Sequence, residues 1–62
     1  MSQLKTLREA AGHSQVYVAT QLGIDQTAVS QWETDKTHPR TTLLSKLAAL
    51  YNCTIDDLLT QP

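Results

Sequence analysis

The segment "SQVYVATQLGIDQTAVSQWET", residues 14–34, decides the fold, because it has the pattern of two short helices joined by a tight turn. Ser14 is a suitable N-cap for the first helix, whose inner side carries Val18 and Ala19. A small residue such as Ala19 lets two helices cross closely. Gly23 then ends this helix, since glycine adopts a left-handed turn conformation without steric cost.

The second helix of this segment has one apolar and one polar side. Asp25 is its predicted N-cap, with a carboxylate placed to accept from the backbone amides of the first turn, and the helix should end near Thr34. At roughly 100° per residue, the apolar side consists of Ala28, Val29 and Trp32. The opposite side carries only uncharged polar groups, on Gln26, Thr27, Ser30 and Gln31. Glutamate and lysine would serve solubility better, so this side indicates a specific use.

Three further helices are expected outside this segment, so the predicted fold is all-α with five short helices. The first helix runs from about Gln3 to Ala11 and stops at Gly12. Residues 34–40 contain Pro39 and show no periodicity, which predicts a loop. Two glycines, two prolines and few β-branched alternations argue against strands.

The fourth and fifth helices follow this loop. Thr41 or Thr42 is expected to cap the fourth helix. Its apolar stripe consists of Leu44, Leu47, Ala48 and Tyr51. Asn52 can end this helix in the left-handed conformation, and Thr54 can cap the fifth. The inward side of the fifth helix is expected to hold Ile55, Leu58 and Leu59.

The composition fits one small domain over residues 1–62. The single cysteine, Cys53, cannot form an internal disulfide, which favours a reducing compartment and a cytoplasmic location. There is no signal-peptide core, and no apolar run reaches the roughly 18 residues of a membrane span. A net charge of −1 neither indicates nor excludes a nucleic-acid partner. No clustered nucleophile, base or metal-ligand set is evident, so we expect no enzyme activity, cofactor, metal or small-molecule substrate.

The segment that decides the fold has the dimensions of a helix-turn-helix, and its surroundings resemble the Cro/CI (XRE) family of phage and bacterial DNA-binding proteins. The resemblance covers nearly the whole chain, through "LKTLREAAGHSQ", "VATQLGID", "VSQWE" and "LSKLAALYNCTIDDLL". It implies a lambda-repressor-like domain whose helix-turn-helix is formed by the second and third helices. The implied function is a sequence-specific, double-stranded DNA-binding transcriptional regulator, expected to act as a repressor.

By this resemblance, the third helix lies in the major groove, and the base-contacting residues are Gln26, Thr27, Ser30 and Gln31. A glutamine amide can present a donor and an acceptor together to adenine, and a threonine methyl can pack on thymine. The alternative interpretation is an ordinary solvated helix surface. The agreement with the motif favours base reading.

The resemblance also implies contacts with DNA phosphates at both ends of the motif. At the start of the second helix, Ser14, Gln15 and the first-turn amides would hold one phosphate. The loop would supply further contacts from Lys36, Thr37, His38 and Arg40. Tyr17 could add its hydroxyl, or Val16 and Tyr17 could instead mark a partner surface.

Four charged residues also bear on the resemblance to the family. Arg8 and Glu33 match a pair that in relatives forms a structural ion pair behind the recognition helix, where removing one partner would strand the other. Asp35 stands where relatives commonly have glycine, and aspartate tolerates the left-handed conformation better than most residues. Asp25 and Asp35 bring negative charge toward DNA, so we expect a shallow salt dependence, with a slope of about −4 for a dimer.

The expected partner is a two-fold symmetric operator, whose half-sites lie about 34 Å apart, so a homodimer is expected on DNA. Its interface should lie around the fifth helix and the preceding loop, with Leu50, Ile55 and Leu59. Such a small interface would be weak and would form mainly on DNA.

The alternative function is a protein-interaction adaptor or antitoxin-like module with secondary DNA contact, which the negative net charge and the apolar Val16–Tyr17 pair support.

Overall fold

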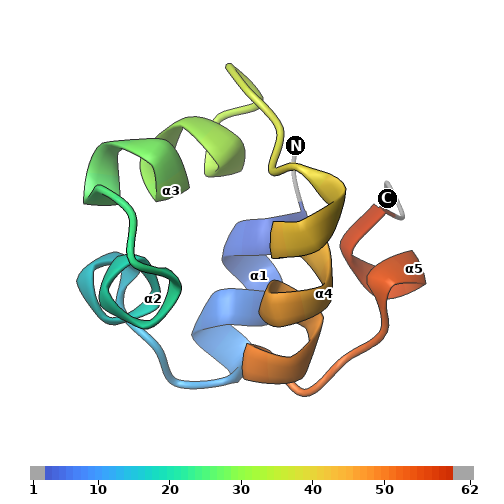
Figure 1. Cartoon of the computed structure of the whole chain (residues 1–62). Coiled ribbons are helices and arrows are strands. Elements are labelled where there is room, and N and C mark those ends of the chain that lie inside the picture. The colour runs from blue at the N-terminus through green and yellow to red at the C-terminus, as the bar shows by residue number, and fades with distance from the viewer. Residues whose placement is uncertain (1–2, 60–62) are drawn as a thin grey trace.

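The computed structural model describes residues 3–59 and contains five α-helices in this part of the chain. They are α1 (Gln3–Ala10), α2 (Gln15–Leu22), α3 (Gln26–Glu33), α4 (Thr41–Leu50) and α5 (Ile55–Leu59). No strand is present between residues 3 and 59. The predicted all-α class with five short helices is therefore confirmed (Figure 1).

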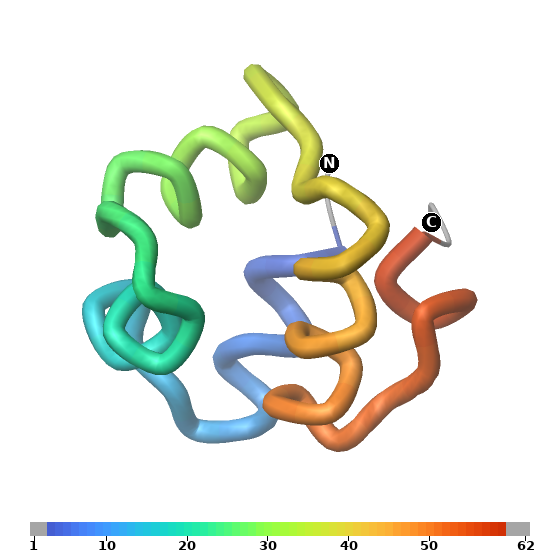
Figure 2. Tube along the Cα trace, in the orientation of Figure 1, coloured from blue at the N-terminus to red at the C-terminus, as the bar shows by residue number. Residues whose placement is uncertain are grey.

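The helices share one apolar core, and α2 and α3 pack on each other more extensively than any other pair. Val18, Val29 and Leu47 are its largest fully buried side chains, one each from α2, α3 and α4. Figure 2 shows the chain leaving α3 through a loop that projects outward before it enters α4. No helix among residues 3–59 combines the length and the apolar character that a membrane span requires.

The turn between α2 and α3 has the predicted geometry. The Ser14 hydroxyl accepts a hydrogen bond from the backbone N–H of Tyr17 at 3.0 Å and thereby caps α2. Gly23 follows α2 with φ at +69°, in the left-handed region. Beyond its chain neighbours, no heavy atom lies within 4 Å of the position that a Cβ would take there. Glycine is thus required by backbone conformation rather than by space.

One predicted helix cap is wrong, and another lacks its predicted hydrogen bond. Asp25 occupies the N-cap position of α3, but its side chain makes no capping hydrogen bond. Arg40, rather than Thr41 or Thr42, is the N-cap of α4. Arg40 is still extended, with ψ at 162°, and the helix begins at Thr41, so the cap lies one residue earlier than the hydroxyl preference of caps suggested.

The turn between α4 and α5 agrees with the predictions. Asn52 adopts the left-handed conformation with φ at +56°. The Thr54 hydroxyl accepts from the Asp57 N–H, and the Asp57 carboxylate accepts from the Thr54 N–H, each at 3.1 Å. These reciprocal bonds satisfy two backbone donors at the start of α5.

The prediction that Leu59 faces inward is wrong, because this side chain is 59% exposed. Leu58 is buried, as predicted. Leu58 and Leu59 point about 100° apart on α5, and the core lies on the side that carries Leu58.

Candidate nucleic-acid interface

A polar depression follows one side of α3. Its walls come from α3 itself, from the start of α2 and from the segment after α3. The lining side chains are Gln15, Gln26, Thr27, Ser30, Gln31, Thr34 and Lys36. The structure thus brings all four predicted base-contacting residues together. None of the lining residues is acidic and one is cationic, so the surface offers hydrogen-bonding groups with a single positive charge.

The opposite side of α3 holds these polar groups outward. Val29 and Trp32 are buried in the core, whereas Gln26 and Thr27 are exposed and Gln31 is half-buried. Protein cores are close-packed, so a helix anchored by two buried side chains cannot rotate freely about its axis. The polar side of α3 therefore has a fixed direction.

Thr34 is a member of the polar depression that the sequence did not predict. Its hydroxyl lies 3.1 Å from the carbonyl oxygen of Ser30 and 3.3 Å from that of Gln31. Residues three and four apart share a helix side, so the spacing from Ser30 and Gln31 carried this signal. The signal was weak because Thr34 lies at the end of the helix.

Behind α3, the structure brings Arg8 of α1 and Glu33 together in a bidentate ion pair. The Arg8 Nε lies 2.6 Å from Glu33 Oε2, and Nη2 donates to Oε1 at 3.2 Å. The two side chains are only 10% and 3% exposed. The hydrogen bond to Glu33 raises the pKa of Arg8 above its ordinary value, so the guanidinium remains charged. Arg8 Nη1 also donates to the His13 carbonyl at 2.7 Å, which ties α1 to the turn before α2.

Gln15 links this ion pair to the polar depression. Its Nε2 donates to Glu33 Oε1 at 2.9 Å, and its Oε1 accepts from Gln26 Nε2 at 3.3 Å. A carboxylate only accepts hydrogen bonds, so Glu33 fixes which end of the Gln15 amide faces inward. That orientation in turn fixes the Gln26 amide, whose carbonyl oxygen and second N–H remain for a ligand.

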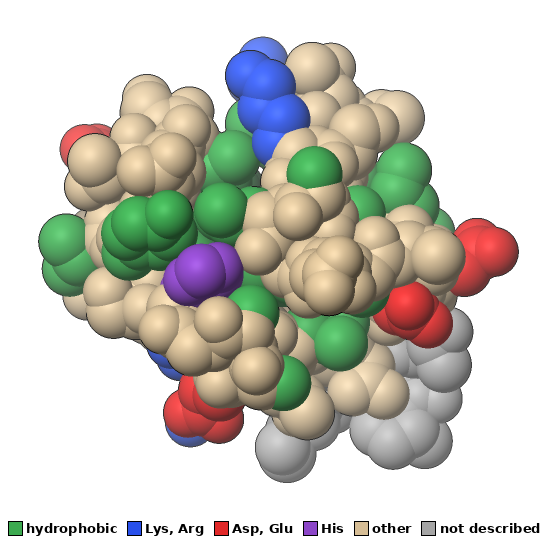
Figure 3. All heavy atoms as spheres, turned by 90° about the horizontal axis from the view of Figure 1, so that it is seen from below, with side chains coloured by type: hydrophobic (Ala, Val, Ile, Leu, Met, Phe, Trp, Pro, Cys, Tyr) green, Lys and Arg blue, Asp and Glu red, His purple; other side chains and the backbone are tan. Residues whose placement is uncertain are grey.

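At the start of α2, Ser14 and Tyr17 are engaged within the protein. Ser14 caps the helix, and the Tyr17 ring stacks on the His13 ring with centroids 4.7 Å apart. The His13 Nε2 lies 3.1 Å from the Leu50 carbonyl oxygen, so this cluster joins the turn before α2 to the end of α4. Tyr17 remains 43% exposed and Val16 56% exposed. Figure 3 views the molecule from below and shows hydrophobic side chains around a histidine.

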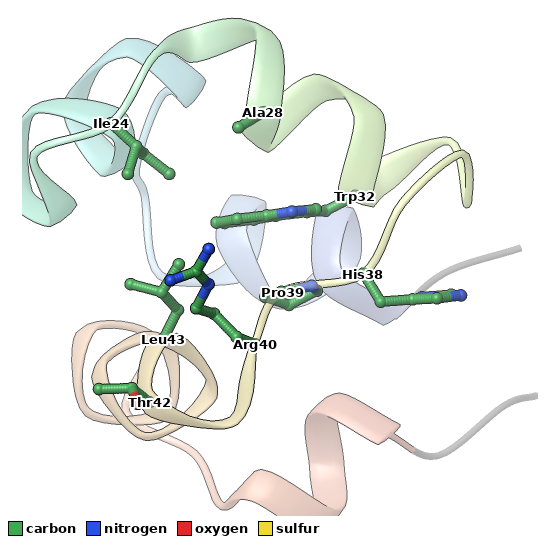
Figure 4. Close-up of a pocket in the computed structure, with 8 residues that line it drawn as sticks. All are labelled: Ile24, Ala28, Trp32, His38, Pro39, Arg40, Thr42 and Leu43. Carbon is green, nitrogen blue, oxygen red and sulfur yellow. The ribbon is translucent and has the colours of Figure 1, made fainter.

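The loop after α3 distributes its exposed side chains over two sides of that helix. Lys36 lines the polar depression, together with the predicted base-contacting residues. Arg40 lines a second, apolar depression on the packed side of α3, whose apolar walls include Ile24, Ala28, Trp32 and Leu43. Figure 4 shows the Arg40 side chain directed into this apolar depression, and His38 also lines it. Thr37, which lies between Lys36 and His38 in sequence, is also exposed.

The three residues predicted at a dimer interface do not share one groove. Leu50 lines a groove with Leu22 of α2, whereas Leu59 lines another with Leu4 of α1. Ile55 is half-buried and packs against the core. A single continuous interface would therefore include the groove of Leu50 or the groove of Leu59, and not all three predicted residues.

Comparisons with known proteins agree with this architecture. Residues 4–58 match a family model described as helix-turn-helix. The chain is 40% identical over 57 residues to the HTH-type transcriptional regulator ImmR of Bacillus subtilis (strain 168), which covers 92% of this chain and 45% of that protein. It is 35% identical over 57 residues to the HTH-type transcriptional activator BcrR of Enterococcus faecalis, over 92% of this chain and 28% of that protein.

The chain thus spans less than half the length of these curated relatives. The matched region nevertheless includes most of α1 and α5 and the whole of α2, α3 and α4. The chain belongs to the XRE-type helix-turn-helix family of DNA-binding transcriptional regulators.

Proposed function

We propose that the protein binds double-stranded DNA sequence-specifically, with α3 in the major groove, and regulates transcription from an operator. The observation that carries this proposal is the polar depression, in which neutral side chains lie together on a helix whose opposite side is buried. Contacts with base edges specify sequence, whereas contacts with phosphates mainly position the protein. A DNA partner also favours a cytoplasmic location in a bacterial or phage-infected cell.

The proposed base contacts follow from the chemistry of each side chain. Gln26 and Gln31 would each pair with adenine N6 and N7, and one such pair contributes about 1–3 kcal/mol of discrimination. The bond from Gln26 to Gln15 favours this geometry, because it orients the amide before DNA arrives. Thr27 would pack its methyl on thymine, and Ser30 would accept from or donate to a neighbouring base edge.

Phosphate contacts would flank these base contacts. At the start of α2, Ser14, Gln15 and the free N–H groups of the first turn would hold one phosphate. The loop would hold another through Thr37, His38 and Arg40. The Tyr17 ring packs on His13, so a phosphate contact from Tyr17 would come from its hydroxyl.

We also propose that two copies bind one two-fold operator, with half-sites about 34 Å apart. A standard protein interface buries about 800 Å² per partner, whereas the whole chain exposes 3983 Å². Leu59 is the most exposed of the three predicted interface residues, and Leu50 and Ile55 are half-buried. The dimer would therefore be weak and form mainly on DNA, where it would block or recruit RNA polymerase.

Selection of bound sequences from random duplexes, followed by titration of variants, tests this function. Gln26→Ala and Gln31→Ala should weaken binding to the selected duplex by about 5- to 150-fold and leave binding to mixed-sequence duplexes nearly unchanged. Arg40→Ala should weaken binding to both kinds of duplex alike. Equal losses on both duplexes for the glutamine variants would overturn the assignment of base contacts.

The second candidate function is a protein-interaction module with secondary DNA contact. The exposed Val16 and Tyr17 side chains on α2 favour it. Titration with mixed-sequence DNA at low and moderate salt separates the two functions. A DNA-binding protein should bind at low salt and weaken as salt rises, whereas an adaptor should bind at neither concentration.

A further inference from the structure

We propose that Lys36 contacts a guanine in the operator instead of binding a backbone phosphate. This inference rests on the proposed function, in which the polar depression of α3 faces the major groove. It concerns a residue beyond the end of α3, in a segment where the family resemblance implies contacts with phosphates only.

The path of the chain after α3 brings Lys36 to the polar depression. Asp35 adopts the left-handed conformation with φ at +62°, which turns the backbone sharply at the end of the helix. The backbone N–H of Lys36 then donates to the carbonyl oxygen of Gln31 at 2.9 Å. This bond ties the backbone of Lys36 to a proposed base-contacting residue, and the lysine side chain lines the same depression as Gln31.

The other cation of this segment lies elsewhere. Arg40 lines the apolar depression on the packed side of α3, where Figure 4 shows its side chain directed inward. If both cations served only to attract the DNA backbone, nothing would require them to separate in this way. A cation also suits the C-terminal end of a helix dipole, but that preference does not direct the side chain toward the base-contacting residues.

The chemistry of an ammonium group selects guanine. Lysine has three donors and no acceptor. Guanine presents two adjacent acceptors in the major groove, O6 and N7, whereas adenine presents one acceptor beside an N–H donor. The neutral readers Gln26, Thr27 and Gln31 suit adenine and thymine, so Lys36 would add the preference that they lack. Because Lys36 is bonded to Gln31, the guanine should lie beside the base read by Gln31, away from that read by Gln26.

The test uses the selected operator with each guanine replaced in turn by 7-deazaguanine, which lacks the N7 acceptor. The wild-type protein should lose about tenfold in affinity at one guanine, next to the position relaxed in Gln31→Ala. Lys36→Met should bind the unmodified operator more weakly and should not respond to that replacement. Arg40→Met is the matched control, because it removes the same charge from the same segment and should keep the full response.

Three results would overturn the inference: an operator without guanine at that position, a Lys36→Met protein that still responds to 7-deazaguanine, or equal losses on operator and mixed-sequence duplexes. Each leaves the proposed function standing if the wild-type protein selects a sequence. A wild-type protein that selects no sequence overturns the proposed function itself. Circular dichroism checks that the variants fold, which is expected because Lys36 and Arg40 are both exposed.

Discussion

The two sides of α3 have opposite surroundings, although both belong to the same eight residues. One side forms the polar depression, and the other packs into the core through Val29 and Trp32 and borders the apolar depression. Apolar burial is non-directional, whereas hydrogen bonds to a base require defined distances and angles. The polar side of α3 can therefore recognise particular bases only to the extent that the packed side holds the helix still.

Hydrogen bonds also hold the polar side of α3 in place, and they differ between the two ends of the helix. Gln26 is held at the N-terminal end of α3 by the chain of bonds through Gln15 and Glu33 to Arg8. At the C-terminal end, the backbone carbonyl of Gln31 accepts hydrogen bonds from the following segment. Specificity at one end thus depends on side-chain orientation, and at the other end on the path of the chain.

Removing the anchor of the packed side should have the largest effect. Trp32→Ala should cost about 3–5 kcal/mol of unfolding free energy, since it empties a buried aromatic site. A chain of this size has roughly 3–5 kcal/mol in total, so the variant should be largely unfolded at 25 °C. Urea titration followed by circular dichroism measures this. Trp32→Phe, which keeps an aromatic ring, should retain a cooperative transition, and a native-like transition in Trp32→Ala would refute the anchoring role.

Breaking the ion pair should have a slightly smaller effect, because Arg8 keeps 10% exposure for water to enter. Arg8→Met leaves the Glu33 carboxylate buried without its partner and should cost about 3 kcal/mol. The double variant Arg8→Met/Glu33→Gln removes the stranded charge, so most of the lost stability should return. Urea midpoints of the single and double variants measure the difference. A double variant no more stable than Arg8→Met would show that the unpaired Glu33 charge does not cause the loss of stability.

The sequence predicts most of the fold because α-helices depend on local signals. The cap at Ser14, the turn at Gly23 and the left-handed Asn52 all act within a few residues of the chain. The failures arise where distant contacts decide. Arg40 caps α4 because of the path of a loop, and Leu59 is exposed because the core accepts only one of two adjacent leucines.

In the candidate site too, the residues set by local periodicity were predicted, and those set by distant contacts were not. A period of about 100° per residue is enough to gather the four predicted base-contacting residues on one side of α3. Periodicity ends with the helix, so it only weakly placed Thr34 beside Ser30 and could not separate Lys36 from Arg40. The bond between Gln15 and Gln26 joins two helices and likewise has no signal in the spacing of residues.

The stability of the core that anchors the packed side of α3 should also depend on alkaline pH, through the buried Tyr51. Burial, followed by the nearby charge of Glu33, raises the pKa of Tyr51 to about 12. An unfolded tyrosine ionises near pH 10, so the stability from keeping Tyr51 neutral is complete below pH 10 and is lost as the pH rises through 12. The loss should reach about 2 kcal/mol near pH 12. Urea midpoints at pH 9 and pH 11.5 measure it, and Tyr51→Phe should show a smaller decline because it lacks the buried hydroxyl.

The smallest expected effect tests the electric field over the polar side. Asp35 adjoins Lys36, so its carboxylate should repel the phosphates near the C-terminal end of α3. Asp35→Asn removes this charge and keeps a residue that tolerates φ at +62°. Affinity for every duplex should rise by about 0.2–1 kcal/mol at low salt, with the gain shrinking as salt increases. Titrations of selected and mixed-sequence duplexes at two salt concentrations measure it. A gain confined to the selected duplex would contradict simple repulsion, which cannot distinguish one sequence from another, and would mean that the Asp35 carboxylate draws the Lys36 ammonium away from its base.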